Sequence, residues 1–334
     1  MINDNGHFVI SLDYELHWGF FDLKTVEEYE ENLANTRRVI ERLLDLSDKY
    51  SIKLTFATVG FLFAKNKEDL IKHIPELTPD YNKSELNPYE LLDDIGYSEK
   101  DDPYHFGHSI LKRIIEHNNH EVGTHTFSHY YCTESGQTKN HFKEDITAAI
   151  NIAENLNTTI ESIVFPRNMF NPEYLDICYK LGIKCYRGTE SSFLYQLENK
   201  PESPYYSWQI FRALRMLDSY INLTGQHTYS LKAINKKNSI INLPQSRFLR
   251  PYNKRLKFLE ALRLRRIKKA MIHAASRNEL FHLWWHPHNF GMNMEENFNV
   301  LEDIFKEYKR LNEKYQFKSE TMTSMANKVI ASLS

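Results

Sequence analysis

The sequence has 334 residues, of which 42 are Lys or Arg and 44 are Asp or Glu, and 41% are hydrophobic. This composition is typical of a soluble globular protein with a sizeable core, and a formal net charge of −2 gives no overall attraction to nucleic acid or membranes. No apolar run approaches the about 18 residues that a membrane-spanning helix needs. Three cysteines without a CxxC pair, and an N-terminus without a signal-peptide pattern, favour a cytoplasmic location.

Short apolar runs alternate with longer helical patterns along the chain, which is typical of βα units. In chain order, we predict strands over residues 7–12, 53–59, 121–124, 162–165, 183–186 and 280–286, and helices over residues 25–50, 106–118, 141–156, 172–181, 255–274 and 294–315. Two stretches interrupt this rhythm: a polar, acidic excursion near residues 78–106 and a less regular region over residues 191–242. Neither reads as an independent unit, so we predict a single domain over residues 1–334.

Two carboxylates close the first predicted strand, in Ser11-Leu-Asp13-Tyr-Glu15. Residues two apart share a face of an extended chain, so Asp13 and Glu15 point the same way. Two carboxylates so close repel each other unless a cation lies between them or one is protonated. The pair therefore indicates either a metal site or a solvated strand end.

Two histidines in the pattern His125-x-x-x-His129 follow the predicted strand over residues 121–124. On a helical turn they would present their imidazoles from one side, and two histidines with a carboxylate form a common divalent-metal triad. The spacing alone is weak, because 15 histidines in 334 residues give roughly 0.7 such pairs by chance. A second pair, His282 and His286, is indeed present.

Two further strand ends carry functional candidates. Arg167 follows the predicted strand over residues 162–165, where it could pair with a catalytic carboxylate or form a surface salt bridge. His286 closes the strand over residues 280–286 and could act as a general acid near neutral pH, or be a structural histidine. All these motifs lie at the carboxyl ends of predicted strands, so in a barrel they would converge on one face.

In this order, the motifs resemble those of the polysaccharide deacetylase family, also called carbohydrate esterase family 4 or the chitooligosaccharide deacetylase homology domain, over roughly residues 7–290. The resemblance implies an α/β fold, a distorted (β/α) barrel of about seven strands. It also implies a catalytic set, Asp13 as base, Arg167 orienting that base and His286 as acid, and a metal-ligand set, Glu15, His125 and His129. His288 and His282 are weaker candidates for the acid.

The chain departs from the family pattern at three places. Asp13 and Glu15 are spaced by one residue where the family usually has two adjacent aspartates, and Pro166-Arg167-Asn168 replaces the usual Arg-x-Pro-aromatic motif. No counterpart of the fourth family motif is found. The implied cofactor is one divalent metal ion, with zinc as the first candidate.

The implied activity is removal of an N-acetyl or other acyl group from an amino sugar of a polysaccharide, a lipid-linked glycan or a sugar-nucleotide precursor. A cytoplasmic enzyme of this kind would act during surface-polysaccharide biosynthesis. The alternatives are a hydrolase of another non-peptide C–N bond, such as a cyclic amide, and an inactive barrel that binds glycan.

A basic segment, residues 247–269, carries ten Lys or Arg and one acid, Glu260. Apolar residues at roughly helical spacing within it indicate an amphipathic helix that could rest on anionic lipid headgroups at the inner face of the membrane, or contact a pyrophosphate. Its apolar stripe could equally face the protein core. Nucleic acid is not an expected partner, because one short patch lies in an otherwise neutral chain.

Overall fold

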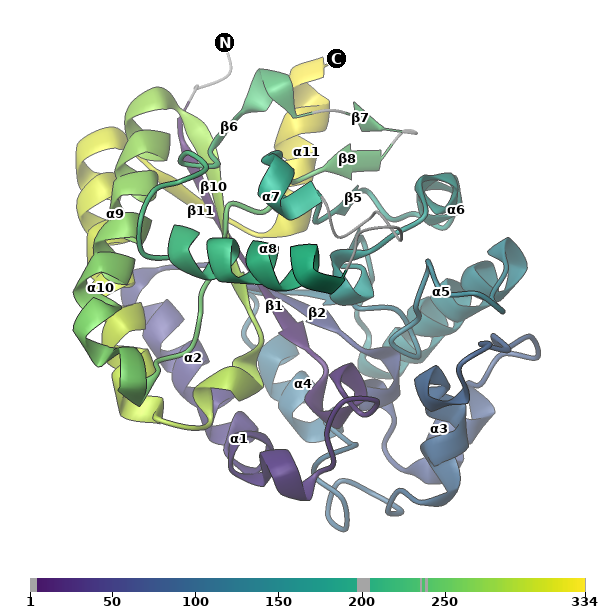
Figure 1. Cartoon of the computed structure of the whole chain (residues 1–334). Coiled ribbons are helices and arrows are strands. Elements are labelled where there is room, and N and C mark those ends of the chain that lie inside the picture. Colours follow the sequence, from purple (N-terminus) through teal and green to yellow (C-terminus); the bar gives the residue numbers. More distant parts are fainter. Residues whose placement is uncertain (1–4, 197–204, 235, 238–239, 334) are drawn as a thin grey trace.

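A computed structural model describes residues 5–196, 205–234, 236–237 and 240–333 of the chain. The described strands belong to a curled central sheet, and helices cover its outside (Figure 1). The strands are β1 (His7–Tyr14), β2 (Thr55–Thr58), β3 (Glu121–Thr124), β4 (Ser162–Ile163), β5 (Cys185–Tyr186), β6 (Tyr229–Ser230), β7 (Lys236–Lys237), β8 (Ile240–Asn242), β9 (Arg247–Phe248), β10 (Glu279–Trp285) and β11 (Lys318–Glu320). The helices are α1 (Glu30–Ala34), α2 (Thr36–Tyr50), α3 (Lys67–Lys72), α4 (His108–Glu116), α5 (Lys139–Ala153), α6 (Leu175–Lys180), α7 (Phe193–Gln196), α8 (Tyr205–Asp218), α9 (Glu260–Arg277), α10 (Met294–Tyr315) and α11 (Met322–Leu333).

Parallel pairing runs from β9 through β10, β1, β2, β3, β4 and β5 to β8. β8 and β9 are the two ends of one stretch, residues 240–248, so the chain that pairs with β5 continues directly to pair with β10. Between them, the N–H of Leu243 donates to the Tyr186 carbonyl (2.9 Å) and the N–H of Ser246 donates to the His282 carbonyl (2.8 Å). The sheet is therefore curled round as a distorted barrel, and the predicted fold class is confirmed.

The strand β1 is buried on both faces, as expected of a central parallel strand. Phe8, Ile10 and Leu12 belong to the large core cluster between the sheet and the helices. Because side chains alternate along a strand, Ser11 and Asp13 point to the opposite face, into the barrel. The alternation of β1 thus separates the residues that stabilise the fold from a polar pair available for chemistry.

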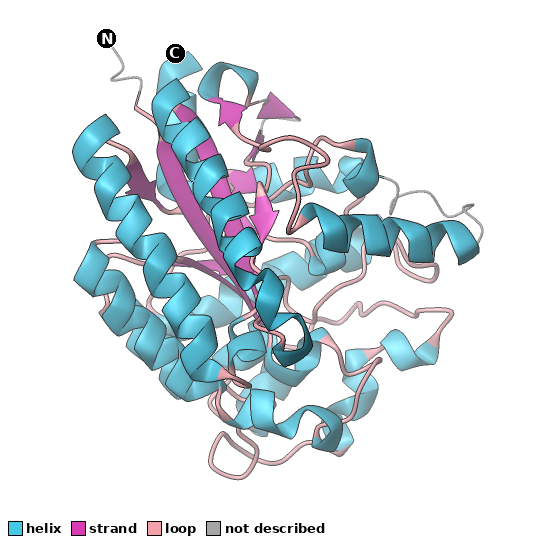
Figure 2. Cartoon of the chain, turned by 60° about the vertical axis from the view of Figure 1, so that its left-hand side comes forward, coloured by secondary structure: helices cyan, strands magenta, loops and turns pink. Residues whose placement is uncertain are grey.

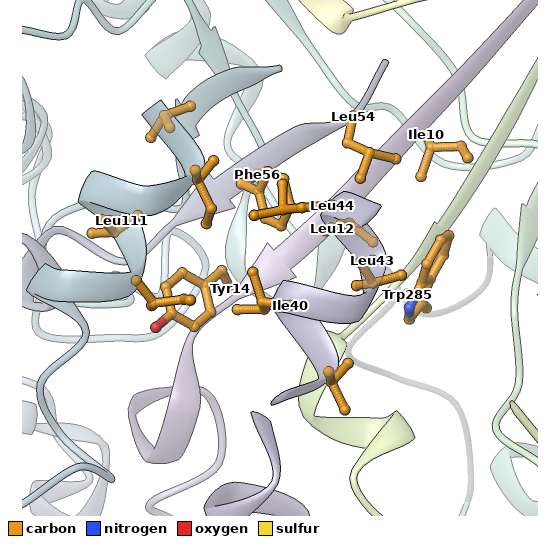
Figure 3. Packing of buried hydrophobic residues seen from close by; sticks show 14 of the residues in the cluster. Ile10, Leu12, Tyr14, Ile40, Leu43, Leu44, Leu54, Phe56, Leu111 and Trp285 are labelled. Atoms are coloured by element: carbon orange, nitrogen blue, oxygen red, sulfur yellow. The ribbon is translucent and has the colours of Figure 1, made fainter. Parts of the chain in front are cut away.

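The helix α2 shows why the outer layer forms. Its residues Ile40, Leu43 and Leu44 lie on one side of the helix, are buried, and pack over Leu12 and Phe56 of the sheet (Figure 3). Burying an aliphatic side chain of this size contributes about 1.5–3 kcal/mol. Long helices lie together in this way outside the strands (Figure 2). Among the described helices, none is long and apolar enough to cross a bilayer.

The predicted elements match the structure best where the apolar pattern is strong. The strand over residues 121–124 and the helix over residues 294–315 have the predicted bounds, whereas the helix predicted over residues 25–50 is divided at Asn35. The region over residues 191–242, read as irregular, contains α8, whose Ile210 and Leu217 are 59% and 45% exposed. A helix that exposes apolar residues has no clean amphipathic stripe to detect.

The excursion near residues 78–106 is a run of turns and short 3-10 helices that nevertheless buries side chains. Tyr81 and Leu86 pack against Tyr131, and Trp18 donates its indole N–H to the His105 carbonyl (2.9 Å). The excursion is therefore anchored on the loops that follow β1 and β3, next to the candidate site.

Candidate active site

The carboxyl end of β1 supplies the two acids. Asp13 lies within the strand and Glu15 one residue beyond it, and both are buried, at 2% and 4% exposure. The chain then turns sharply, with Leu16 at a φ of 48°. Gly19 lies so close to the Glu15 carboxylate that a Cβ atom there would be 2.0 Å from the carboxyl carbon. The turn therefore presses the Glu15 side chain into the interior of the site.

The loop after β3 supplies the two histidines, but not on the helical turn that the spacing predicts. Thr126 and His129 have φ values of 67° and 57°, which a helix does not allow, so the predicted turn is wrong. Asp145 of α5 holds the loop by accepting hydrogen bonds from the N–H groups of Phe127 (2.7 Å) and Ser128 (3.1 Å). Left-handed backbone at non-glycine residues is strained, and such strain is often kept at functional sites.

The histidines of this loop meet Glu15. Nε2 of His125 and Nε2 of His129 lie 3.2 and 3.4 Å from Oε2 of Glu15, and the three ligand atoms lie within 4.8 Å of one another. The structure therefore brings together the three predicted metal ligands.

The hydrogen bonds of His125 show that a cation fits between these groups. Its Nδ1 lies 2.9 Å from the carbonyl oxygen of Val164, and because a carbonyl only accepts, Nδ1 carries the proton. In the neutral ring the lone pair of Nε2 then faces the Glu15 carboxylate, so two acceptors oppose each other. A divalent ion satisfies both, and the Nδ1 bond fixes the ring for that purpose.

The acids keep their negative charge despite their burial. Burial by itself raises the pKa of Glu15, but the neighbouring imidazoles of His286, His125 and His129 outweigh it and hold that pKa well below its usual range. Burial likewise opposes ionisation of Asp13, yet Arg187 foremost brings its pKa below the ordinary value. Both carboxylates are therefore ionised at neutral pH.

The arginine that holds Asp13 is Arg187, directly after β5. Its Nη1 and Nη2 each donate to one oxygen of Asp13 at 2.7 Å, and its Nε and Nη2 also donate to Oδ1 of Asn168 at 3.2 and 2.9 Å. A bidentate ion pair of this kind fixes the position of the carboxylate and keeps it ionised. Arg187 is not part of any of the predicted motifs, although it follows the predicted strand over residues 183–186.

Arg167, predicted to orient Asp13, instead forms an ion pair with Asp22 and stacks on the ring of Tyr131 at 4.3 Å. This is a correction of the predicted contact. The physical reason is local: Arg167 and Asn168 both have a φ of 55°, so the loop directs Asn168 toward Arg187 and Arg167 toward the outside. Arg167 contacts Tyr131, whose ring lies 5.2 Å from that of His129.

His286 lies at the end of β10, with Nε2 3.7 Å from Oδ2 of Asp13 and 3.5 Å from Oε1 of Glu15. Its side chain is 24% exposed, so it can meet a substrate. His288 stacks on it at 5.3 Å, but burial first, and His286 second, lower the pKa of His288 to about 3. Of these two histidines, His286 is the better placed to give a proton.

His282 has a structural role in the barrel interior. It is fully buried, with Nδ1 3.2 Å from the Leu243 carbonyl and Nε2 2.9 Å from the hydroxyl of Ser11. Burial first, and then Arg187, lower its pKa to about 3. It therefore joins β10, β1 and the stretch after β8 as a neutral ring.

Glu15 also belongs to a second group with ligand spacing, which it forms with His286 and His288. Its Oε2 faces His125 and His129, whereas its Oε1 faces His286. The set with His125 and His129 is the more rigid of the two, because both histidines are buried and Nδ1 of His125 is hydrogen-bonded to the Val164 carbonyl.

A comparison with protein families finds a match that includes part of this site. Residues 29–186 match the family model of the polysaccharide deacetylases. This match confirms, for that region, the resemblance to the polysaccharide deacetylases that the motifs indicate. The match includes His125, His129 and Arg167 and does not extend to Asp13, Glu15 or His286. It supports a deacetylase activity in general, on a carbohydrate amide, in a family that generally uses a divalent metal.

Solved structures share the fold at low sequence identity. A Mycobacterium smegmatis protein assigned as a polysaccharide deacetylase superimposes with a TM-score of 0.60 at 12% identity, covering 100% of this chain and 93% of that one. One from Pseudomonas aeruginosa PAO1 gives 0.55 at 10% identity, with 98% and 92% covered, and the Puue allantoinase gives 0.57 at 10%, with 99% and 92% covered. These likenesses establish the fold alone. No curated protein matches the sequence at a significant level.

Proposed function

We propose that this protein is a metal-dependent hydrolase that removes an acyl group from the nitrogen of an amino sugar in a polysaccharide, a lipid-linked glycan or a sugar-nucleotide precursor. One observation carries the proposal. Three ligand atoms, from Glu15, His125 and His129, converge within 4.8 Å directly beside an aspartate, Asp13, that is held ionised by a buried arginine. Two imidazoles and one carboxylate are the ligands of many catalytic zinc sites.

The metal would have a defined place and task. Glu15, His125 and His129 would hold a divalent ion, with zinc as the first candidate, which when bound polarises the amide carbonyl and makes water more acidic. Asp13 is then the base that takes the proton of the attacking water. Its place beside Glu15 and its pairing with Arg187 keep it charged and aligned for that transfer.

The leaving nitrogen needs a proton, because an amide anion leaves poorly. His286 gives it from Nε2, the atom nearest to Asp13 and Glu15. Phe248, Trp284 and His288 pack around its ring, with centroids 6.0, 5.6 and 5.3 Å away, and Asn289 contacts its Nδ1 at 3.3 Å. These contacts limit the motion of the ring, which favours proton transfer in one direction.

A cleft of about 300 Å³ opens onto this group and provides room for a sugar ring. Glu15 and His286 line this cleft, together with Phe20, Tyr29 and Phe248. Aromatic faces suit the apolar faces of a pyranose. The cleft therefore supports a carbohydrate amide as substrate.

The test is release of acetate from N-acetylated chitooligosaccharides and from UDP-N-acetylglucosamine by the zinc-loaded protein. We expect turnover of at least one of them, and Asp13→Asn to lower kcat by about 10²–10⁴-fold while the metal content stays unchanged. Near-normal turnover in Asp13→Asn would reject its role as base. Opening of allantoin without release of acetate would favour the cyclic-amide alternative instead.

The basic segment, residues 247–269, supports a peripheral contact with an anionic membrane at the cytoplasmic face, although not along its whole length. Ile267 and Met271 of α9 face the core, and Arg263 and Arg266 are buried. Its exposed residues include most of the 3-10 helix Lys254–Leu259, whose Phe258 is 73% exposed, and Leu262, which is 43% exposed. Sedimentation with vesicles that contain phosphatidylglycerol tests the contact, and equal recovery with neutral vesicles would contradict it.

A further inference from the structure

A second cavity, of about 540 Å³, lies beside the cleft and has an unusual charge. Four arginines line it, Arg212 and Arg215 of α8 together with Arg247 and Arg250 of the segment that begins with β9. Among the described residues that line it, Glu190 is the one acid. The helix α8 crosses the molecule in front of the sheet in Figure 1, so it forms an outer wall of this cavity.

The guanidinium groups of this cavity are close enough to repel one another. Burial is the main cause that lowers the pKa of Arg250, and repulsion from Arg215 and Arg212 lowers it further. Like charges around a partly buried space weaken a fold unless an anion lies among them. The cavity is therefore a candidate anion site.

Arg247 has donors that nothing in the described part of the chain accepts. The residue is 3% exposed, and its Nη1 donates to the backbone carbonyl and to Oδ2 of Asp218, both at 3.2 Å. Its Nε and Nη2 are buried without a hydrogen-bond partner among the described residues, as is Nε1 of Trp284, which also lines the cavity. Buried donors without acceptors destabilise a fold, so a bound acceptor is expected here.

Two aromatic residues join this cavity to the candidate active site. Phe248 lines both the cavity and the cleft that contains Glu15 and His286. Trp284 lines the cavity and packs under the guanidinium of Arg187, at 4.1 Å from the ring centroid. A small molecule could therefore place one group among the arginines while its sugar lies in the cleft.

We infer that the substrate is a diphosphate ester of an N-acyl amino sugar, and that its phosphates bind in this cavity. The inference rests on the proposed function, whose substrate it narrows. A diphosphate carries two or more charges and several acceptor oxygens, so several guanidinium groups can bind it at once. A single carboxylate has two oxygens, and one guanidinium group that binds both of them is enough. Four arginines thus fit a diphosphate better than a uronic acid.

Two sources supply this chemistry, a nucleoside diphosphate sugar and a prenyl diphosphate sugar. The cavity does not exclude either one. Ile210, Met216 and Leu217 of α8 are 59%, 40% and 45% exposed near Arg212 and Arg215, so a hydrocarbon chain would find apolar surface beside the phosphates. The experiment must therefore include both sources.

The first measurement is calorimetric binding of UDP and of farnesyl diphosphate to the full-length protein. We expect at least one of them to bind, with affinity about tenfold or more lower in Arg250→Gln and in Arg212→Gln, because each removes charge-assisted hydrogen bonds. Arg310→Gln, on the surface of α10, is the charge-matched control and should bind normally. Binding should also persist in His125→Ala, which would show that diphosphate binding in the cavity does not depend on the metal.

The second measurement compares kcat/KM for UDP-N-acetylglucosamine, for a prenyl diphosphate of N-acetylglucosamine and for neutral chitooligosaccharides. We expect a diphosphate ester to be preferred, and Arg250→Gln to reduce this preference. Equal kcat/KM for the neutral and diphosphate substrates, or tighter binding of glucuronate than of either diphosphate, would overturn the inference and leave the deacetylase proposal intact. Diphosphate binding without turnover of any acylated sugar would instead overturn the deacetylase proposal.

Discussion

Arg187 and Asp13 form a bidentate ion pair inside the barrel. Both N–O distances are 2.7 Å, and the side chains are 0% and 3% exposed. The two residues are 174 positions apart in the sequence: Asp13 lies on β1 and Arg187 directly after β5. The pair joins two strand ends across the barrel and keeps the proposed base ionised. It is the contact on which the catalytic proposal depends most directly.

Replacement of this arginine tests that contact. In Arg187→Gln the pKa of Asp13 should rise, because the guanidinium is the main group that lowers it, so the acid limb of the pH–rate profile should move to higher pH. We expect kcat to fall by about 10²-fold or more and the free energy of unfolding to fall by about 3–5 kcal/mol, since Asp13 is left buried without its partner. Arg167→Gln, which breaks a partly exposed pair with Asp22, should lower kcat and the unfolding free energy much less. If the acid limb moves only in Arg167→Gln, then Arg167 and not Arg187 is the residue that holds Asp13.

Loss of a ligand should remove the metal. We expect His125→Ala to bind zinc far more weakly than wild type, and dialysis of the wild-type protein against a chelator to abolish turnover until zinc is restored. Elemental analysis of the purified proteins measures this directly, with His282→Asn as a histidine control from the same barrel interior. Unchanged zinc in His125→Ala would remove that residue from the ligand set.

Gly19→Ala tests the position of Glu15 without changing any ligand. The new Cβ atom would lie 2.0 Å from the Glu15 carboxyl carbon, and this flexible side chain can move away where a backbone could not. We therefore expect a folded protein with near-normal melting temperature and reduced zinc affinity. Thermal unfolding with a zinc titration measures both, and full zinc affinity in the folded variant would show that Glu15 is not needed as a ligand.

Asp145→Ala tests the support of the histidine loop. This buried carboxylate accepts hydrogen bonds from the N–H groups of Phe127 and Ser128, so its removal leaves those donors without an acceptor. We expect a loss of about 1–3 kcal/mol in unfolding free energy and of about 10–100-fold in zinc affinity. Lys143→Ala, an exposed position on the same helix, should change neither quantity.

The arginine cavity should bind a diphosphate more weakly as pH rises. Burial raises the pKa of Glu190 to about 7, while Gln245, Arg247 and Arg187 act in the opposite direction, and Tyr195 and Tyr229 lie near it. Glu190 is mostly neutral at pH 6 and mostly charged at pH 8, so its charge opposes a phosphate only at the higher pH. We expect the affinity for UDP-glucose, whose phosphates keep their charge over this range, to fall up to about tenfold. Glu190→Gln should make the affinity independent of pH, and a wild-type affinity that rises with pH would contradict this account.

Much of the candidate site could be predicted from strand ends alone. Asp13, Glu15, His125, His129 and His286 all follow or close predicted strands, and the carboxyl ends of neighbouring parallel strands meet at one edge of a sheet. Their convergence therefore followed from the order of elements and did not require side-chain coordinates.

The choice between two arginines could not be predicted in this way. Arg167 and Arg187 both follow predicted strands, so the rule that selects Arg167 also applies to Arg187. What separates them is the left-handed backbone at Arg167 and Asn168, which directs one side chain inward and the other outward. Asparagine is common in this conformation but arginine is not, so the residue types alone do not predict it at both positions.

The sequence by itself determined the layered barrel, because apolar runs and helical periodicity record which face of each element is buried. It also determined which ligand types stand at the strand ends. Only the tertiary structure decided that Arg187 holds Asp13 and that four arginines, from α8 and from the segment after β8, surround one cavity. Such contacts depend on distances and backbone angles between segments far apart in the chain, and these arise only when the whole sheet closes.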